Sequence, residues 1–354
     1  MNTDRSHFEN LTVDHIRFCV DDLDARTAEF VRGYGLTVTD EPDPTGAEHT
    51  AVLARGDIRL VLSRPPHDEH PDAVYTRRHG DGVADIALGT ADAAGAFAEA
   101  VRRGARPLAE PVEKGGVVTA SVAGFGDVAH TFVQRPAARP AADVAARTDA
   151  AARTDAAVTD TGLRYVDHFA VCVEAGELDA TVEFYERVLD FRMIFEERMV
   201  IGAQAMNSKV VQSGSGLVTL TVIEPDTTRD PGQIDGFLKN HGGAGVQHVA
   251  FATDDIMRTV TTMRSAGVEF LDTPDAYYGK LPERLALSRH SSEQLGSLRI
   301  LADEDHAGQL FQIFTRSTHR HQTLFFEVIE RAGATTFGSG NIRALYEAVA
   351  AEDE

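Results

Sequence analysis

The chain repeats itself, and this repetition constrains its fold more than any other feature of the sequence. The first matched pair reads VDHIRFCV in one copy and VDHFAVCV in the other. Two further pairs follow in the same order along the chain, and ordered similarity predicts two tandem copies of one structural unit. The matched segments are 13–20 with 166–173, 82–87 with 245–250, and 126–135 with 307–316.

The repeat defines the expected domain organisation. We predict an N-terminal domain at residues 1–135 and a C-terminal domain at 163–354. Residues 136–162 between them are rich in Ala, Asp and Arg without apolar periodicity, which is typical of a linker. Within each copy the apolar period alternates between that of strands and that of helices. An α+β fold with two βαβββ units in each domain is therefore expected.

Charge and cysteine content exclude several classes of function. The net charge of this 354-residue chain is −21, which disfavours nucleic acid and anionic membrane surfaces as partners. Cys19 and Cys172 are the two cysteines, and they occupy equivalent positions of the repeat, so a disulfide framework is not expected. We find no signal-peptide pattern and no apolar run of membrane-spanning length, so a cytoplasmic location is predicted.

Two histidines and one carboxylate stand on predicted strands of the second copy. His168 lies on its first strand, His248 on the strand that opens its second unit, and Glu327 on a late strand. Two His and one carboxylate form the facial triad that binds Fe(II) and leaves adjacent positions open for substrate and O₂. Alternate residues share one face of a strand, and the neighbours of these three on that face are small or apolar. The pattern predicts a dry metal pocket.

A histidine in a strand is more often a hydrogen-bonded core residue than a ligand, so the two copies must be compared. The first copy has His15 and Asp85 at the positions of His168 and His248, and no glutamate at the position of Glu327. One complete set and one broken set would not be expected of purely structural residues. We therefore predict a non-catalytic N-terminal domain and an iron-binding C-terminal domain.

Longer motifs surround these three residues. They are DHF at 167–169, QAMNSKVV at 204–211, GVQHVA at 245–250, DED at 303–305, LFQIFT at 310–315 and FFEVIER at 325–331. Together they resemble the 4-hydroxyphenylpyruvate dioxygenase family, and the resemblance covers nearly the whole chain. It implies the vicinal-oxygen-chelate fold with open barrels of paired βαβββ units, an Fe(II) cofactor, a homodimer, and 4-hydroxyphenylpyruvate with O₂ as substrates.

The family has two branches that act on the same keto acid. One hydroxylates the aromatic ring and forms homogentisate, and the other hydroxylates the benzylic carbon and forms 4-hydroxymandelate. Thr221, Ile223 and Ile342 stand where the ring-hydroxylating branch typically has Pro, Asn and Phe. A single Phe-to-Ile change can be a neutral apolar swap, but the three departures agree. The resemblance thus implies the mandelate-forming branch, which supplies 4-hydroxyphenylglycine for peptide antibiotics.

The resemblance also implies which side chains surround the substrate. The expected contacts are Ser208, Thr221, Gln233, Gln312, Phe314, Phe337 and Ile342. Gln247 and Asn341 are expected beside the metal ligands. No catalytic residue beyond the three ligands is expected. Plain core packing is an equal alternative for Phe314, while Phe337 and the amphipathic C-terminal helix are expected to form a lid.

Three alternatives stay open at this point. A homogentisate-forming dioxygenase would share the substrate and the triad. An extradiol dioxygenase, which cleaves a catechol ring, would share the fold and the triad but not the keto acid. A metal-free binding protein of the same fold would have neither bound iron nor O₂ uptake.

Overall fold

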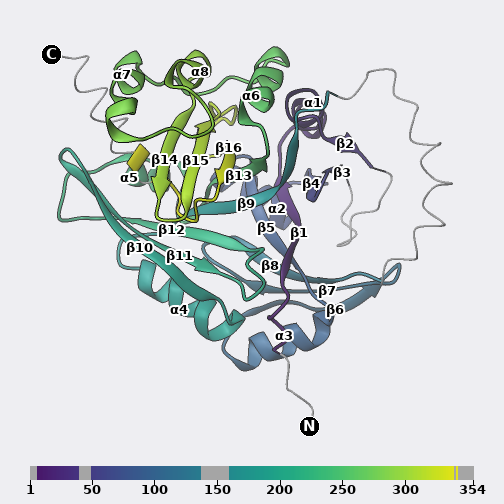
Figure 1. Ribbon diagram of the computed structural model, residues 1–354. Coiled ribbons are helices and arrows are strands. Elements are labelled where there is room, and N and C mark those ends of the chain that lie inside the picture. The colour runs from purple at the N-terminus through teal and green to yellow at the C-terminus, as the bar shows by residue number, and fades with distance from the viewer. Residues whose placement is uncertain (1–5, 40–48, 137–158, 339, 342–354) are drawn as a thin grey trace, which may run out of the picture.

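The computed structural model describes residues 6–39, 49–136, 159–338 and 340–341, and these form two curled eight-stranded sheets (Figure 1). The first sheet contains β1 (Thr12–Cys19), β2 (Thr37–Val38), β3 (Thr50–Arg55), β4 (Ile58–Ser63), β5 (Gly82–Gly89), β6 (Pro107–Lys114), β7 (Val117–Ala123) and β8 (Ala129–Gln134). The second contains β9 (Leu163–Cys172), β10 (Arg192–Ile201), β11 (Gln204–Gln212), β12 (Thr219–Pro225), β13 (Gly245–Thr253), β14 (Leu301–Asp305), β15 (Gly308–Phe314) and β16 (Phe325–Ala332).

Helices pack against both faces of the sheets. Those of the first half are α1 (Leu23–Tyr34), α2 (Pro71–His79) and α3 (Ala93–Arg102), and those of the second are α4 (Leu178–Leu189), α5 (Gln233–His241), α6 (Ile256–Ser265), α7 (Asp275–Arg284) and α8 (Ser292–Leu298). Aspartates begin two of these helices: Asp92 caps α3 and Asp255 caps α6, each through its side chain. In the described part of the chain, no helix has both the length and the apolarity needed to cross a bilayer.

The two sheets have the same strand order. The first runs β2-β3-β4-β1-β5-β8-β7-β6 and the second runs β10-β11-β12-β9-β13-β16-β15-β14. In each sheet the two central strands are antiparallel, and each of them has a parallel neighbour on its other side. This is the pattern of two βαβββ units joined at their first strands, so the tandem α+β organisation predicted from the repeat is confirmed.

One of the three sequence matches joins strands that are not equivalent. Strand β8 occupies the sheet position of β16, and not that of β15, so the match of 126–135 with 307–316 is wrong. The equivalent segments are 129–135 and 325–331, because β5 and β8 pair in the same register as β13 and β16. Short strands alternate apolar and polar residues with a period of two, and many registers therefore look alike in sequence.

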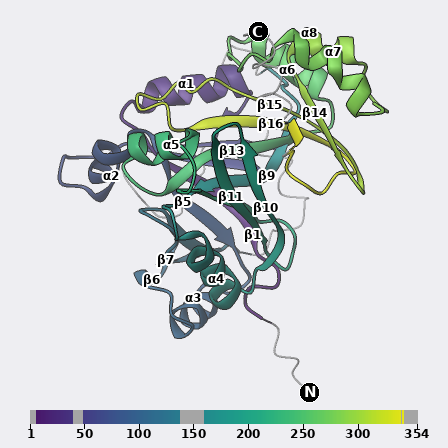
Figure 2. The same cartoon turned by 90° about the vertical axis from the view of Figure 1, so that its left-hand side faces the viewer.

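The two halves share one hydrophobic core. From the first half, α1 places Phe30 and Tyr34 against Phe326 of β16, at ring-centroid distances of 5.4 Å and 5.2 Å. Figure 2 shows α1 beside β15 and β16, with α3 and α4 together at the opposite end of the molecule. Because Phe326 directly precedes Glu327, the first half supports the strand of the candidate metal site from the side opposite the carboxylate.

Candidate metal centre

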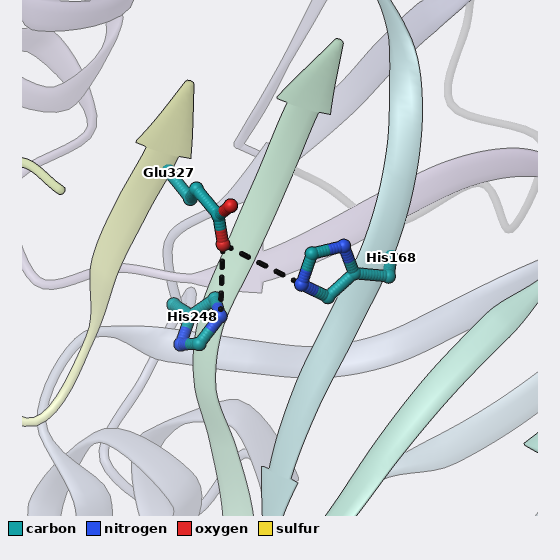
Figure 3. A group of neighbouring side chains, drawn as sticks. All are labelled: His168, His248 and Glu327. Atoms are coloured by element: carbon teal, nitrogen blue, oxygen red, sulfur yellow. Dashed lines mark ion pairs between the residues drawn. The ribbon is translucent and has the colours of Figure 1, made fainter. Parts of the chain in front are cut away.

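Three neighbouring strands bring the candidate ligands together. Strand β13 lies between β9 and β16, so it carries His248 between the strands of His168 and Glu327 (Figure 3). Ala250 is the register partner of both His168 and Glu327. Directly paired residues point to the same face of a sheet, and the small methyl group of Ala250 leaves space between the two larger side chains.

The ligand atoms converge on one carboxylate oxygen. The Nε2 atom of His168 lies 3.4 Å from Oε2 of Glu327, and the Nε2 atom of His248 lies 3.3 Å from the same oxygen. Among the residues that the structure describes, these three form the group of His, Cys, Asp or Glu whose donor atoms all lie within 4.8 Å of one another. The two imidazole rings are nearly perpendicular, at 79°. Two nitrogens and one oxygen thus approach a common point from one side.

Both imidazoles are held through their other nitrogen. Nδ1 of His168 lies 2.8 Å from Oδ1 of Asp167, and Nδ1 of His248 lies 3.3 Å from Oε1 of Gln247. Both partners are acceptors, so each Nδ1 donates to its partner, and each Nε2 is the nitrogen that faces the common point and would bind a metal. A hydrogen bond of this kind fixes the tautomer and ring orientation of a metal-binding histidine.

Burial makes the triad electrostatically costly without a cation. His168 and Glu327 are 4% and 2% exposed, and Oε1 of Glu327 has no hydrogen-bond partner. Burial alone would lower the pKa of His168, but Glu327 and Asp167 together raise it to about 9. Burial lowers the pKa of His248, whereas the two imidazoles outweigh burial and lower the pKa of Glu327. A buried carboxylate with an unsatisfied oxygen is costly, and an N,N,O donor set of this kind fits Fe(II).

The residues predicted for the substrate on β11 and β12 face the same side as the triad. Thr221 pairs with Ala170, which shares the face of His168, and Ser208 pairs with Ile223, two residues from Thr221. Thr221 is buried and its hydroxyl oxygen has no hydrogen-bond partner. The structure thus places both hydroxyl groups on the triad's face of the sheet.

Strand β15 contributes from the other side of the triad. Phe314 is the register partner of Glu327, and Gln312 is the partner of Ile329, which shares the face of Glu327. The Phe314 ring meets the His248 ring edge-on at 5.6 Å. Gln312 is 1% exposed, and its Oε1 has no hydrogen-bond partner. An unsatisfied buried amide oxygen next to a candidate metal site is a group that a bound molecule could satisfy.

The remaining side chains predicted for the site lie in different surroundings. Phe337 lies against the triad, with its ring 5.0 Å from that of His168. Gln233 is exposed at the first turn of α5, and Asn341 instead accepts a hydrogen bond from the Tyr277 hydroxyl at 2.7 Å. The predicted roles of these two side chains, a substrate contact for Gln233 and a place beside the metal ligands for Asn341, stay predictions. Ile342 lies outside the described residues.

The sequence analysis missed two side chains that support the centre. Arg331 forms a two-pronged ion pair with Asp167, the residue that holds His168. Phe325 stacks on His248, with ring centroids 5.0 Å apart. A usable signal was present for the ion pair, because an aspartate precedes the first-strand histidine in both copies, and an arginine stands directly after β8 and near the end of β16.

Comparisons with known proteins agree with the duplicated architecture. A model described as the Glyoxalase/Bleomycin resistance protein/Dioxygenase superfamily matches residues 165–283, and a second model of the same description matches 14–121. Both halves therefore match one superfamily, which confirms the predicted vicinal-oxygen-chelate fold in two tandem domains.

Full-length relatives share most of the chain. A 4-hydroxyphenylpyruvate dioxygenase from Dictyostelium discoideum is 33% identical over 322 residues, which cover 86% of this chain and 87% of that protein. One from Yarrowia lipolytica is 29% identical and covers 96% and 91%. A solved triple mutant of 4-hydroxymandelate synthase from Streptomyces coelicolor is 38% identical, with a TM-score of 0.83 and coverage of 98% of this chain and 100% of that one.

Proposed function

The chain belongs to the 4-hydroxyphenylpyruvate dioxygenase family, and from this membership we propose that it converts 4-hydroxyphenylpyruvate and O₂ to 4-hydroxymandelate and CO₂. The reaction would be an Fe(II)-dependent oxidative decarboxylation with hydroxylation of the benzylic carbon. Such a product would supply 4-hydroxyphenylglycine for peptide antibiotics. We further propose a homodimer, as the family resemblance implies.

The convergence of three donor atoms on one point carries the proposal. His168, His248 and Glu327 would hold ferrous iron on one side and leave the opposite side open. Bound iron would supply coordination sites for the keto acid and O₂ and the redox capacity for the oxidation. The protein's share is to hold the imidazoles in one tautomer, through Asp167 and Gln247.

The surrounding side chains would bind and orient the substrate. Ser208, Thr221 and Gln312 offer hydroxyl and amide groups that can hydrogen-bond a phenol or carboxylate without adding charge. Phe314 and Phe337 flank the two imidazoles and would pack against an aromatic ring. These apolar and uncharged walls would also exclude water from the reacting atoms.

The choice of the mandelate branch rests on three residues of the sequence. Thr221 and Ile223 replace the Pro and Asn typical of ring-hydroxylating members, and both share a face with Ala170 in the same sheet. Ile342 replaces a Phe, which would remove one aromatic wall and let the substrate ring tilt. A displacement of about 1 Å can decide which carbon reacts. The 38% identity to the solved mutant of a 4-hydroxymandelate synthase supports this branch.

Homogentisate formation is the second candidate. It is favoured by the curated relatives, since the Dictyostelium and Yarrowia proteins both bear the name 4-hydroxyphenylpyruvate dioxygenase. The two products have the same elemental composition, so mass alone cannot separate them. An aerobic incubation with 4-hydroxyphenylpyruvate and Fe(II), followed by chromatography against both standards, identifies the product.

Each outcome of that incubation has a clear meaning. Hydroxymandelate supports the proposal, and homogentisate alone moves the chain to the ring-hydroxylating branch. Turnover of a catechol without turnover of the keto acid would indicate an extradiol dioxygenase. Absence of both iron binding and O₂ uptake would indicate a binding protein of the same fold.

A further inference from the structure

An ion pair holds the first candidate ligand from behind. Oδ1 of Asp167 lies 2.8 Å from Nδ1 of His168 and 2.8 Å from Nη2 of Arg331, while Oδ2 accepts from Nε of Arg331 at 2.8 Å. The Asp167 carboxylate is 7% exposed and the guanidinium fork matches its two oxygens. The acceptor for His168 is thus a fixed carboxylate.

The same guanidinium holds a second part of the chain. Nη1 of Arg331 donates to the carbonyl oxygens of Ala334 at 3.2 Å and Thr336 at 2.6 Å. The Arg331 guanidinium also lies over the Phe337 ring, 5.0 Å from its centroid. One side chain therefore contacts both the support of His168 and the segment 334–337.

The segment returns to the metal centre through its last residue. The Phe337 ring meets the His168 ring edge-on at 5.0 Å. His168, Asp167, Arg331 and Phe337 thus form a closed ring of contacts, in which each side chain touches the next. Asp305 holds the segment at a second point. Its carboxylate accepts hydrogen bonds from the backbone nitrogens of Thr335 at 2.7 Å and Thr336 at 2.8 Å.

The first half contains the same pair without a triad. Asp14 accepts from Arg135 at 2.6 Å and 2.8 Å, and its Oδ1 lies 2.7 Å from Nδ1 of His15. By position in the sheets, Arg135 corresponds to Arg331 and His15 to His168. The ion pair therefore belongs to the duplicated fold, and the first half is an internal control for its purely structural contribution.

We propose that Arg331 is a positioning residue that couples metal binding at His168 to the order of the segment 334–337 and of Phe337. The inference rests on the proposed metal site. A cation on Nε2 of His168 strengthens Nδ1–H as a donor, which tightens its bond to Asp167. A more firmly held Asp167 orients the guanidinium that grips the segment. Because coupling between two events is reciprocal, an ordered segment should also favour metal binding.

The first test is metal affinity measured with Co(II), which needs no turnover. Arg331→Met keeps an unbranched apolar stem and removes the fork, and Arg135→Met makes the same change in the first half. We expect Arg331→Met to weaken Co(II) binding about 10–100-fold and to shift the visible Co(II) absorption bands. Arg135→Met should leave both unchanged, although each variant loses an equivalent ion pair.

The second test is hydrogen exchange of peptides that cover residues 332–338, measured with and without Co(II). In the wild type and in Arg135→Met, the metal should slow exchange of this segment. In Arg331→Met the metal should have little effect on it. Arg331→Lys keeps the charge and loses the fork geometry, so it provides a milder variant with the same expectation if Arg331→Met does not fold.

The outcomes separate this inference from the proposed function. If the wild type binds no Co(II), the metal site itself is wrong and the coupling is wrong with it. If the wild type binds Co(II) and the Arg331 variants bind it as tightly, with the same slowing of exchange, then the coupling is overturned and the metal site stands.

Discussion

Thr131 occupies in the first sheet the position that Glu327 occupies in the second. Asp85 of β5 pairs with Ala129 of β8, and His248 of β13 pairs with Phe325 of β16. Thr131 and Glu327 each lie two residues further along those strands. The backbone nitrogen of Thr131 donates to Asp85 at 3.0 Å and its hydroxyl donates to the same carboxylate. The acidic group of the first half is therefore satisfied within the protein, whereas Glu327 keeps an unpartnered oxygen.

This relationship predicts one metal ion per chain. Glu327→Gln removes the charged ligand and should weaken Co(II) binding by at least about 100-fold, with loss of O₂ uptake. Titration calorimetry gives both the affinity and the stoichiometry. Asp85→Asn alters the corresponding region of the first half and should leave one equivalent bound at the wild-type affinity. A second equivalent that disappears in Asp85→Asn would contradict the prediction.

The steric account of product choice predicts that Ile342→Phe diverts part of the product to ring hydroxylation. The added ring would restore the aromatic wall typical of the homogentisate branch and tilt the substrate back. Chromatography of both products measures the partition. Ile223→Asn introduces on β12 the residue typical of the ring-hydroxylating branch. Combined with Ile342→Phe, it should increase the share of ring-hydroxylated product. An active Ile342→Phe variant that forms hydroxymandelate alone would show that residue 342 does not control the outcome.

The aromatic contact between the halves predicts a large loss of stability on truncation. Phe30 is 2% exposed and packs edge-on against Phe326 at 5.4 Å. Phe30→Ala should lower the free energy of unfolding by about 3–5 kcal/mol, because it leaves a cavity between the halves. Urea denaturation measures the change. Val74→Ala, at a residue 53% exposed, should change it by less than about 0.5 kcal/mol.

A small effect at Phe30 would mean that the halves do not depend on each other for stability. In that case the two sheets should also unfold in separate transitions. A single transition with a large loss would show that the scaffold half stabilises the strand of Glu327.

A buried histidine predicts that the protein loses stability in mild acid. Burial is the main cause that lowers the pKa of His241 to about 4, and His79, which stacks on it at 4.2 Å, lowers it further. An unfolded histidine titrates near 6.5, so below that pH the unfolded chain binds the proton first. The contribution of His241 is complete above pH 6.5 and is lost as the pH falls toward 4.

Between about pH 7.5 and about pH 5, His241 should account for a loss of about 2 kcal/mol in the free energy of unfolding. His241→Gln should reduce the pH dependence by that amount, even if it lowers stability at neutral pH. His306→Gln, at an exposed position, should leave the pH dependence unchanged. An unchanged slope in His241→Gln would show that another group governs the acid sensitivity.

The sequence alone was sufficient for the architecture and for the residues of the candidate triad. The repeated VDH strand and the aspartate-capped helices are local patterns, and periods of 2 and 3.6 residues follow from backbone geometry. The triad could be selected because the two copies differ at His248 and Glu327. Those differences are visible along the chain without knowing which strands are neighbours.

Tertiary structure alone decided that β8 is the counterpart of β16, and that Asp167 pairs with Arg331. Asp167 and Arg331 are 164 positions apart in the sequence, and the motif around each residue does not indicate its ion-pair partner. It also placed Asn341 within hydrogen-bond distance of the Tyr277 hydroxyl, a contact that no local pattern indicates. Hydrophobic patterning specifies which face of a strand is buried, whereas a particular contact depends on how distant strands align when the whole core closes.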